Sequence, residues 1–97
     1  MRLISQGGMI DVPYEQAIIE YEACERNGED VFYIIFAKTT RNTFSIAKYS
    51  TEAKALKVME MLREEYLQYC TARSNEYWFA FNNPKVFQFP KDDEVEV

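Results

Sequence analysis

Residues 31–70 combine two strand patterns with one long helical pattern, and this order sets the class of fold that the chain can adopt. Residues 31–37 are apolar throughout, and a second run, residues 44–49, follows a polar turn. From about residue 51, apolar side chains recur every three or four positions, as they do on one side of a helix. We therefore expect an antiparallel hairpin that leads into an α-helix over about residues 51–70.

Shorter strand patterns flank this unit. Gly7-Gly8 and Asn27-Gly28 supply the positive φ angles that tight hairpin turns require. The flanking strands are expected at residues 1–6, 9–12, 17–25, 76–81 and 85–90. We predict an α+β fold, in which an antiparallel sheet of five to six hairpin-connected strands packs against the one long helix.

Length and charge limit the organisation and the partners of the chain. Ninety-seven residues with 47% apolar content suit a single domain, which we place at residues 1–90. Residues 91–97 carry four acidic side chains and are expected to form a flexible tail. The net charge of −5 disfavours direct binding to nucleic acid. Without a membrane-length apolar stretch or a signal segment, we expect a cytoplasmic location and no contact with a membrane.

Few residues of the chain are suited to catalysis. It contains no histidine, which removes the usual general base and the commonest metal ligand. Cys24 and Cys70 lack the spacing of a metal site, and no lysine of a phosphate-binding loop follows Gly7-Gly8. The acidic clusters fall on solvated faces, in turns or in the tail. We expect no enzyme activity, no catalytic or metal-binding residues and no cofactor.

An aromatic and cationic group in the C-terminal third is the strongest candidate for a binding site. Aromatic faces, guanidinium groups and side-chain amides are what a nucleobase and its phosphate require. The candidate ligand-binding residues are Arg73, Tyr77, Trp78, Asn82 and Asn83 of this group, together with Arg41 on the predicted turn before residue 44. The alternative is that the alternating residues Tyr77, Phe79 and Phe81 belong to the core.

The strand at residues 31–38 is apolar on both faces, which is typical of a central strand that is covered on both sides. One helix of about 20 residues can cover only one face of a sheet. The second cover would be the aromatic C-terminal segment or another copy of the chain. We therefore expect a homo-oligomer.

Three segments carry a resemblance: MRLISQGGMIDVPYE (residues 1–15), AKYSTEAKA (residues 47–55) and FQFPKDDEV (residues 87–95). In them the chain resembles a group of small uncharacterised proteins from clostridial gut bacteria and their prophages. The group has no assigned activity that would transfer to single residues. The resemblance implies a context, namely an accessory protein of a phage or mobile element in the cytosol of a Gram-positive bacterial host.

In that context we expect a non-enzymatic binding protein, a phage- or prophage-encoded antagonist of host immunity that sequesters a nucleotide-type small molecule. Two alternatives stay open. Acidic residues such as Asp92, Asp93 and Glu94 would suit a protein–protein inhibitor or nucleic-acid mimic that blocks a basic surface of a host defence protein. The surplus of apolar surface would suit a structural or assembly protein of a mobile element.

Overall fold

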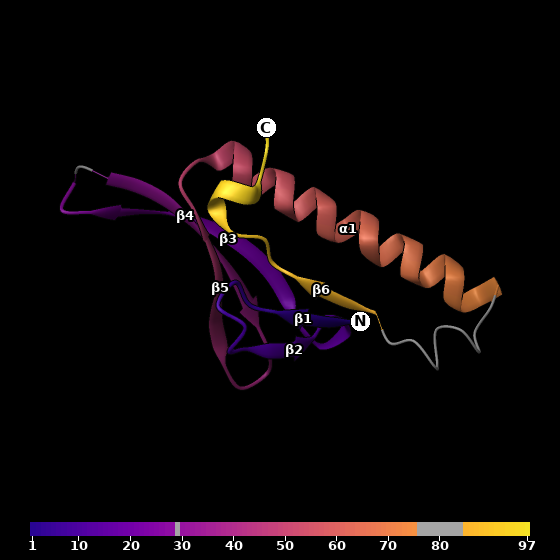
Figure 1. Cartoon of the computed structure of the whole chain (residues 1–97). Helices are drawn as coiled ribbons and strands as arrows, with labels where there is room; N and C mark the ends of the chain where they lie inside the picture. The colour runs from indigo at the N-terminus through magenta and orange to yellow at the C-terminus, as the bar shows by residue number, and fades with distance from the viewer. Residues whose placement is uncertain (29, 76–84) are drawn as a thin grey trace.

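The chain folds as an α+β protein, as its sequence predicts (Figure 1). A computed structural model describes residues 1–28, 30–75 and 85–97. Three strands are long: β3 (Ile18–Arg26), β4 (Asp30–Lys38) and β5 (Thr43–Tyr49). Three are short: β1 (Arg2–Ile4), β2 (Asp11–Pro13) and β6 (Val86–Gln88). The helix α1 spans Glu52–Asn75, and single 3-10 turns lie at η1 (Tyr14–Gln16) and η2 (Asp92–Glu94).

The strands of the described residues form two sheets of three, so the prediction of one sheet with five to six strands is wrong. One sheet has the order β2-β1-β6 and the other β3-β4-β5. In the first sheet β1 pairs antiparallel with β2 but parallel with β6. Turn residues identify which consecutive strands form a hairpin, but they do not say which hairpins share a sheet. The strand predicted at residues 76–81 lies outside the described residues.

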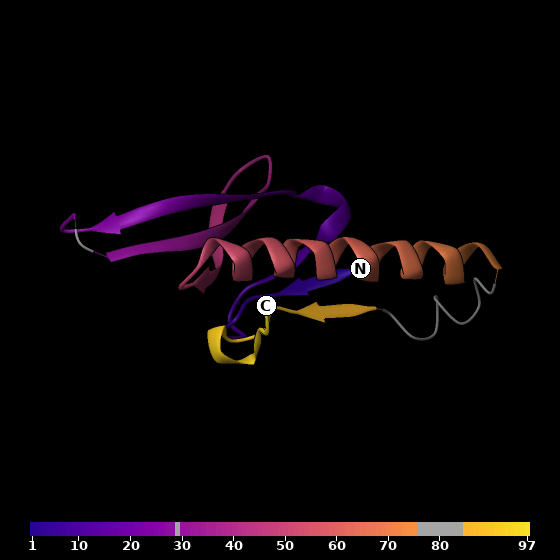
Figure 2. The same ribbon diagram turned by 90° about the horizontal axis from the view of Figure 1, so that it is seen from above.

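The β3–β4 ribbon is the most extended part of the molecule. Nine residue pairs join the two strands, and Asn27 and Gly28 take φ angles of 54° and 75° in the connecting turn, as expected for these residues. The ribbon projects from one end of the molecule, while the C-terminal half of α1 projects from the other (Figures 1 and 2). The overall extents are therefore 51 × 33 × 18 Å.

The helix α1 begins after Thr51, whose hydroxyl oxygen accepts a hydrogen bond from the Lys54 backbone N–H at 3.2 Å. In the view from above, α1 runs between the β3–β4 ribbon and the strands β1 and β6 (Figure 2). It buries Ala55, Val58 and Leu62 completely or nearly so. No helix among the described residues is long and apolar enough to span a membrane.

The core joins both sheets to the helix. Its largest fully buried side chains are Leu3, Ile35, Ile46, Tyr49, Val58 and Phe89. The Tyr49 hydroxyl donates a hydrogen bond of 2.7 Å to the Pro90 carbonyl, which satisfies the one polar group of that side chain. Burial raises the pKa of Tyr49 above its ordinary value, so the side chain stays neutral at any ordinary pH.

Gln6 connects the two sheets through both its side chain and its backbone. Its amide nitrogen donates to the carbonyls of Lys48 and Pro90 at 3.1 and 2.9 Å, and its amide oxygen accepts from the Lys48 backbone N–H at 2.9 Å. Its own backbone N–H donates to the Ile46 carbonyl at 2.9 Å. The side chain of Gln6 thus pairs with β5 as a neighbouring strand would.

Residues 91–97, whose composition predicts a flexible tail, contact the rest of the chain through Asp92 and Val95. Val95 is 6% exposed and belongs to the core. The Asp92 carboxylate accepts hydrogen bonds from the backbone N–H and the hydroxyl of Ser50, at 2.8 and 3.0 Å. The acidic composition of this segment suggests a solvated tail, because composition does not register a single apolar residue that fits a core position.

Candidate functional site

A notch opens on the side of the projecting ribbon, where β5 ends and the chain turns into α1. The pairing of β4 with β5 stops at Tyr33 and Tyr49, whereas β3 and β4 remain paired as far as Arg26 and Asp30. The edge of β4 at residues 30–32 therefore has no neighbour from β5. The notch has a volume of about 400 Å³, and its lining includes Arg26, Asp30, Phe32, Lys48, Ser50 and Asp92.

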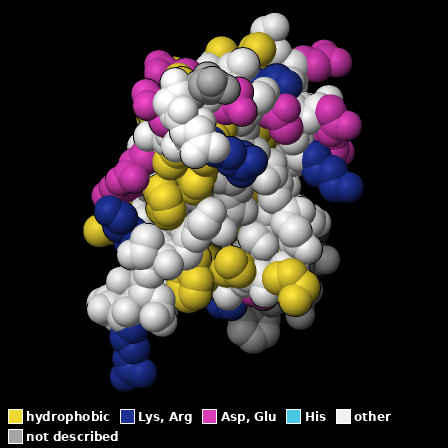
Figure 3. Space-filling view, turned by 90° about the vertical axis from the view of Figure 1, so that its left-hand side faces the viewer, with side chains coloured by type: hydrophobic (Ala, Val, Ile, Leu, Met, Phe, Trp, Pro, Cys, Tyr) yellow, Lys and Arg dark blue, Asp and Glu magenta, His cyan; other side chains and the backbone are white. Residues whose placement is uncertain are grey.

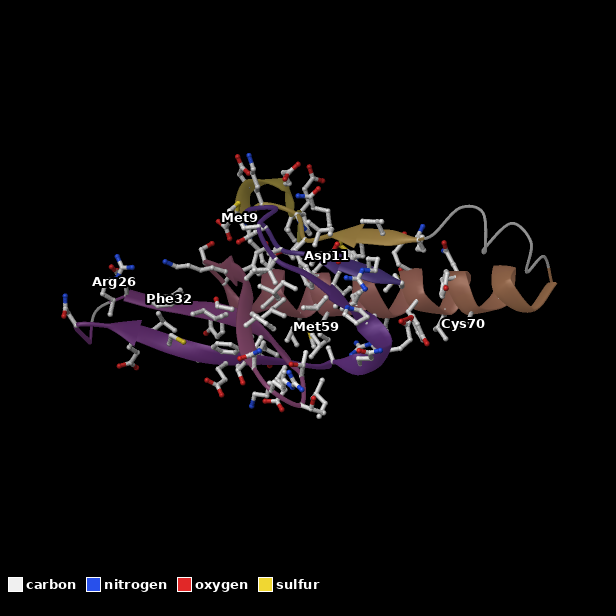
Figure 4. The ribbon with its side chains drawn as sticks, turned by 90° about the horizontal axis from the view of Figure 1, so that it is seen from below. Met9, Asp11, Arg26, Phe32, Met59 and Cys70 are labelled. Carbon is white, nitrogen blue, oxygen red and sulfur yellow. The ribbon has the colours of Figure 1, made fainter. Side chains whose placement is uncertain are left out.

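Two cations approach one aromatic ring in this notch. The Lys48 ammonium lies 4.3 Å from the centroid of the Phe32 ring, and the Arg26 guanidinium carbon lies 5.9 Å from it. Both distances fall within the range of cation–π attraction. Arg26 and Phe32 lie on neighbouring strands near the free end of the ribbon (Figure 4). The end-on view shows hydrophobic side chains at the surface between basic and acidic ones (Figure 3).

A β-bulge in β5 places Lys48 on this face of the sheet. The register shifts by one residue between Ile35, which pairs with Ala47, and Phe36, which pairs with Ser45, so Ile46 is the extra residue. Without that extra residue, every β5 side chain beyond the shift would point to the opposite face, because side chains alternate along a strand. Lys48 would then enter the core and Tyr49 would point to solvent.

Asp92, which lines one wall of the notch, already has its hydrogen-bond and ion-pair partners within the chain. The backbone N–H of Ser50 donates to the Asp92 carboxylate, the Ser50 hydroxyl does the same, and the Lys54 ammonium lies 3.4 Å from it. These donors, the Ser50 backbone first, hold the pKa of Asp92 below its ordinary value. Lys54 therefore neutralises Asp92. Among the lining residues named above, this leaves Asp30 as the carboxylate that can balance the positive charges of Arg26 and Lys48.

Among the residues proposed from the sequence, Arg41 is not part of the lining of this notch. Arg41 is exposed on the turn between β4 and β5, and about 20 Å of strand separates the Phe32 end of β4 from that turn. Arg73 belongs to the last turn of α1. Tyr77, Trp78, Asn82 and Asn83 lie outside the described residues, so the proposal for them remains a prediction.

Sequence reasoning missed Arg26, Phe32 and Lys48. The turn at Asn27-Gly28 carries a usable signal for two of them, because a hairpin centred there places Arg26 and Phe32 on one face of neighbouring strands. No such signal exists for Lys48. A strict alternation along β5 assigns it to the wrong face, and only the bulge corrects this.

Comparison of the chain with protein-family models, with curated proteins and with solved structures found no match. The functional reading therefore rests on the site itself. In the described parts of the chain, no group of three or more acidic or cysteine side chains converges as metal ligands would.

Proposed function

We propose that the chain is a non-catalytic binding protein that sequesters an anionic ligand with a planar ring, of the nucleotide type, in the notch beside the ribbon. The observation that carries the proposal is the Phe32 ring with the ammonium of Lys48 at 4.3 Å and the guanidinium carbon of Arg26 at 5.9 Å, at the margin of an open volume of about 400 Å³. Pockets for small ligands typically start near this size.

Each of the three side chains has a role in this proposal. The Phe32 ring is a stacking surface for a base, and stacking is tolerant of sequence because every base has an aromatic face. Arg26 can bind two phosphate oxygens at once through its planar guanidinium, while Lys48 acts as a mobile point charge. Lys48 would leave the ring and move to the phosphate when a base stacks. Sequestration needs only this binding and no reacting group.

The role as an antagonist of host immunity is part of the same proposal and rests on the resemblance to prophage proteins. A protein that removes a signalling nucleotide acts in proportion to its amount. Such a protein therefore needs tight binding rather than turnover. A hydrophobic and aromatic notch flanked by two cations suits tight binding of an organic phosphate better than binding of inorganic phosphate alone.

Isothermal titration calorimetry with cyclic dinucleotides, cyclic oligonucleotides and ADP-ribose tests the proposal, with inorganic pyrophosphate as the probe that lacks a ring. We expect Phe32→Leu to weaken binding of the ring-containing ligand by about 1–3 kcal/mol, roughly 5- to 150-fold in Kd. Lys48→Gln should weaken binding of all the phosphates. The matched control is Lys57→Gln on the exposed side of α1, which should bind as the unaltered chain does.

Thermal unfolding gives an independent check on the same ligands. A ligand at 100 times its Kd should stabilise the folded state by about 2.7 kcal/mol. For a chain of this length, each kcal/mol corresponds to roughly 4–8 °C in Tm. The proposal is refuted if none of the ring-containing phosphates raises the Tm, or if the Phe32→Leu variant binds them as tightly as the unaltered chain does.

A second candidate function, blocking a basic surface of a host protein, is favoured by the acidic end of the molecule. Glu52, Asp93, Glu94 and Glu96 are all exposed, and the packing of Val95 holds this end of the chain in place. Asp92 differs from them because it binds Ser50 and Lys54, outside its own segment, whereas Glu94 accepts a hydrogen bond from the Lys91 backbone N–H within that segment. Neutralising Asp93, Glu94 and Glu96 together should therefore abolish salt-sensitive binding to a basic nuclease without unfolding the chain, whereas ligand binding in the notch should stay unchanged.

A further inference from the structure

The outer face of the β3-β4-β5 sheet is apolar along its centre. Phe32, Ile34 and Phe36 project from β4 to this face and are only half-buried. The side chains that alternate with them point to the core, where Ile35 and Ala37 are fully buried and Tyr33 is partly buried. A row of three large apolar residues that the described parts of the chain leave partly exposed is unusual for a chain that acts alone.

Charged residues flank this apolar row in an ordered way. Glu22 of β3 pairs in register with Ile34 of β4, and Ile34 pairs with Lys48 of β5. A line across the sheet at this register therefore contains an acidic, an apolar and a basic side chain, namely Glu22, Ile34 and Lys48. A neighbouring ion pair on the same face, between Lys38 and Glu20 at 3.0 Å, is already satisfied within the chain. Glu22 and Lys48 are both exposed.

We propose that a second copy of this chain covers the face, around a twofold axis that runs parallel to β4 between the two facing sheets. This operation places β3 of one copy opposite β5 of the other. Glu22 then faces the partner's Lys48, twice by symmetry, and Ile34 and Phe36 pack against the same residues across the axis. Two sheets packed in this way keep their strands nearly aligned, about 10 Å apart.

Charge excludes the other face-to-face arrangement. A twofold axis perpendicular to the strands would stack β3 on β3 and β5 on β5. Glu22 would then lie near the partner's Glu22, and Lys48 near the partner's Lys48. Like charges opposed across an interface disfavour an arrangement strongly. The self-complementary pattern is therefore evidence for a second copy in one particular orientation.

The size of the face sets the expected strength of association. Nine residues at about 3.3 Å and three strands about 4.8 Å apart give a flat area of roughly 400 Å² per copy. Stable interfaces typically bury about 800 Å² per partner. We therefore expect a reversible dimer with a Kd in the micromolar range. Phe32 and Lys48 belong both to this face and to the lining of the notch, whereas Glu22, Ile34 and Phe36 belong to the face alone. The inference stands apart from the proposed function because self-association is measured without any ligand.

Sedimentation equilibrium over about 1 μM to 1 mM tests the inference with two charge-reversed variants. The unaltered chain should approach twice its mass of 11.5 kDa. Glu22→Lys alone and Lys48→Glu alone should each raise the dimer Kd at least tenfold, because each opposes like charges across the axis. An equimolar mixture of the two variants should associate again, since every opposed pair is then of opposite charge. Recovery in the mixture also shows that both variants are folded.

The matched control is Glu25→Lys, which makes the same charge change on β3 but on the other face of the strand. It should dimerise as the unaltered chain does. The inference is overturned if the unaltered chain stays at 11.5 kDa over the whole range, as it would if a different protein or nothing covers the face. It is equally overturned if the two variants dimerise normally, or if their mixture fails to associate.

Discussion

Replacing Gln6 by alanine tests whether a single side chain holds the two sheets together. Gln6→Ala removes three hydrogen bonds, which join the amide group to the Lys48 backbone N–H, the Lys48 carbonyl and the Pro90 carbonyl. The backbone bond from Gln6 to the Ile46 carbonyl remains. The substitution therefore isolates the contribution of the side chain.

The magnitude follows from what happens to each abandoned partner. A hydrogen bond contributes about 0.5–1.5 kcal/mol net, and the cost rises when the partner is left dry. Lys48 is exposed, so water can replace the amide at both of its backbone groups. The Pro90 carbonyl is part-buried but keeps the Tyr49 hydroxyl at 2.7 Å. We expect a loss of about 1.5–2.5 kcal/mol in the free energy of unfolding.

Urea unfolding followed by circular dichroism measures this loss, with Gln16→Ala on the exposed η1 turn as the matched control. Combining Gln6→Ala with Tyr49→Phe provides a sharper test, because both side chains donate to the Pro90 carbonyl. Either single variant leaves that carbonyl one donor, and the double variant leaves it none. The double variant should lose about 1 kcal/mol more than the sum of the two singles. Additive losses, or a Gln6→Ala variant as stable as the control, would refute the reasoning.

Two further predictions concern the helix and the C-terminal segment. Leu62→Ala should lower the free energy of unfolding by about 2–5 kcal/mol, because Leu62 is 2% exposed. Leu67 is 65% exposed, so Leu67→Ala should change the free energy of unfolding by less than about 0.5 kcal/mol. Equal effects of the two substitutions in urea unfolding would contradict the placement of the core. The pKa of Asp92 is lowered from 3.8 in the folded state, so the stabilisation by its charge should be complete above about pH 5 and should be lost as the pH falls below 3.8. Asp92→Asn should therefore unfold at a lower urea concentration than the unaltered chain near neutral pH, and this difference in stability should shrink in acid. A difference in stability that does not depend on pH would show that Ser50 and Lys54 do not stabilise the charged form of Asp92.

Local signals in the sequence account for the parts of the fold that form between neighbours in the chain. The turn at Asn27-Gly28 and the apolar run after it predict the β3–β4 ribbon. The stop in that run and the polar turn after it predict β5. The apolar pattern predicts a helix that ends near Cys70. The helix α1 continues to Asn75, because no glycine or proline between these residues breaks it. These elements depend on propensities and turn conformations that act over a few residues.

The remaining features depend on contacts between distant parts of the chain. Strands of three residues, such as β1 and β6, contain too few side chains for their pattern to identify a partner. The bulge at Ile46 is visible only when β5 is aligned with β4, so the face on which Lys48 lies could not be read from β5 alone. The aromatic group near Trp78 that the sequence favours lies outside the described residues and stays a prediction. Composition can reveal a cluster of aromatic residues along the sequence. It cannot reveal that a shift in register brings Lys48 to the Phe32 ring.

The parallel pairing of β1 with β6 has a consequence for synthesis of the chain in the cell. Arg2 pairs with Val86, and the difference of these two numbers is a separation of 84 residues. At about 5–20 residues per second, a ribosome needs roughly 4–17 s to add that many residues. During this interval the β1–β2 hairpin lacks the β6 strand that pairs with the other edge of β1. The sheet of β2, β1 and β6 can therefore be completed only after β6 has been made, whereas the β3–β4 ribbon can fold as soon as its two strands are made.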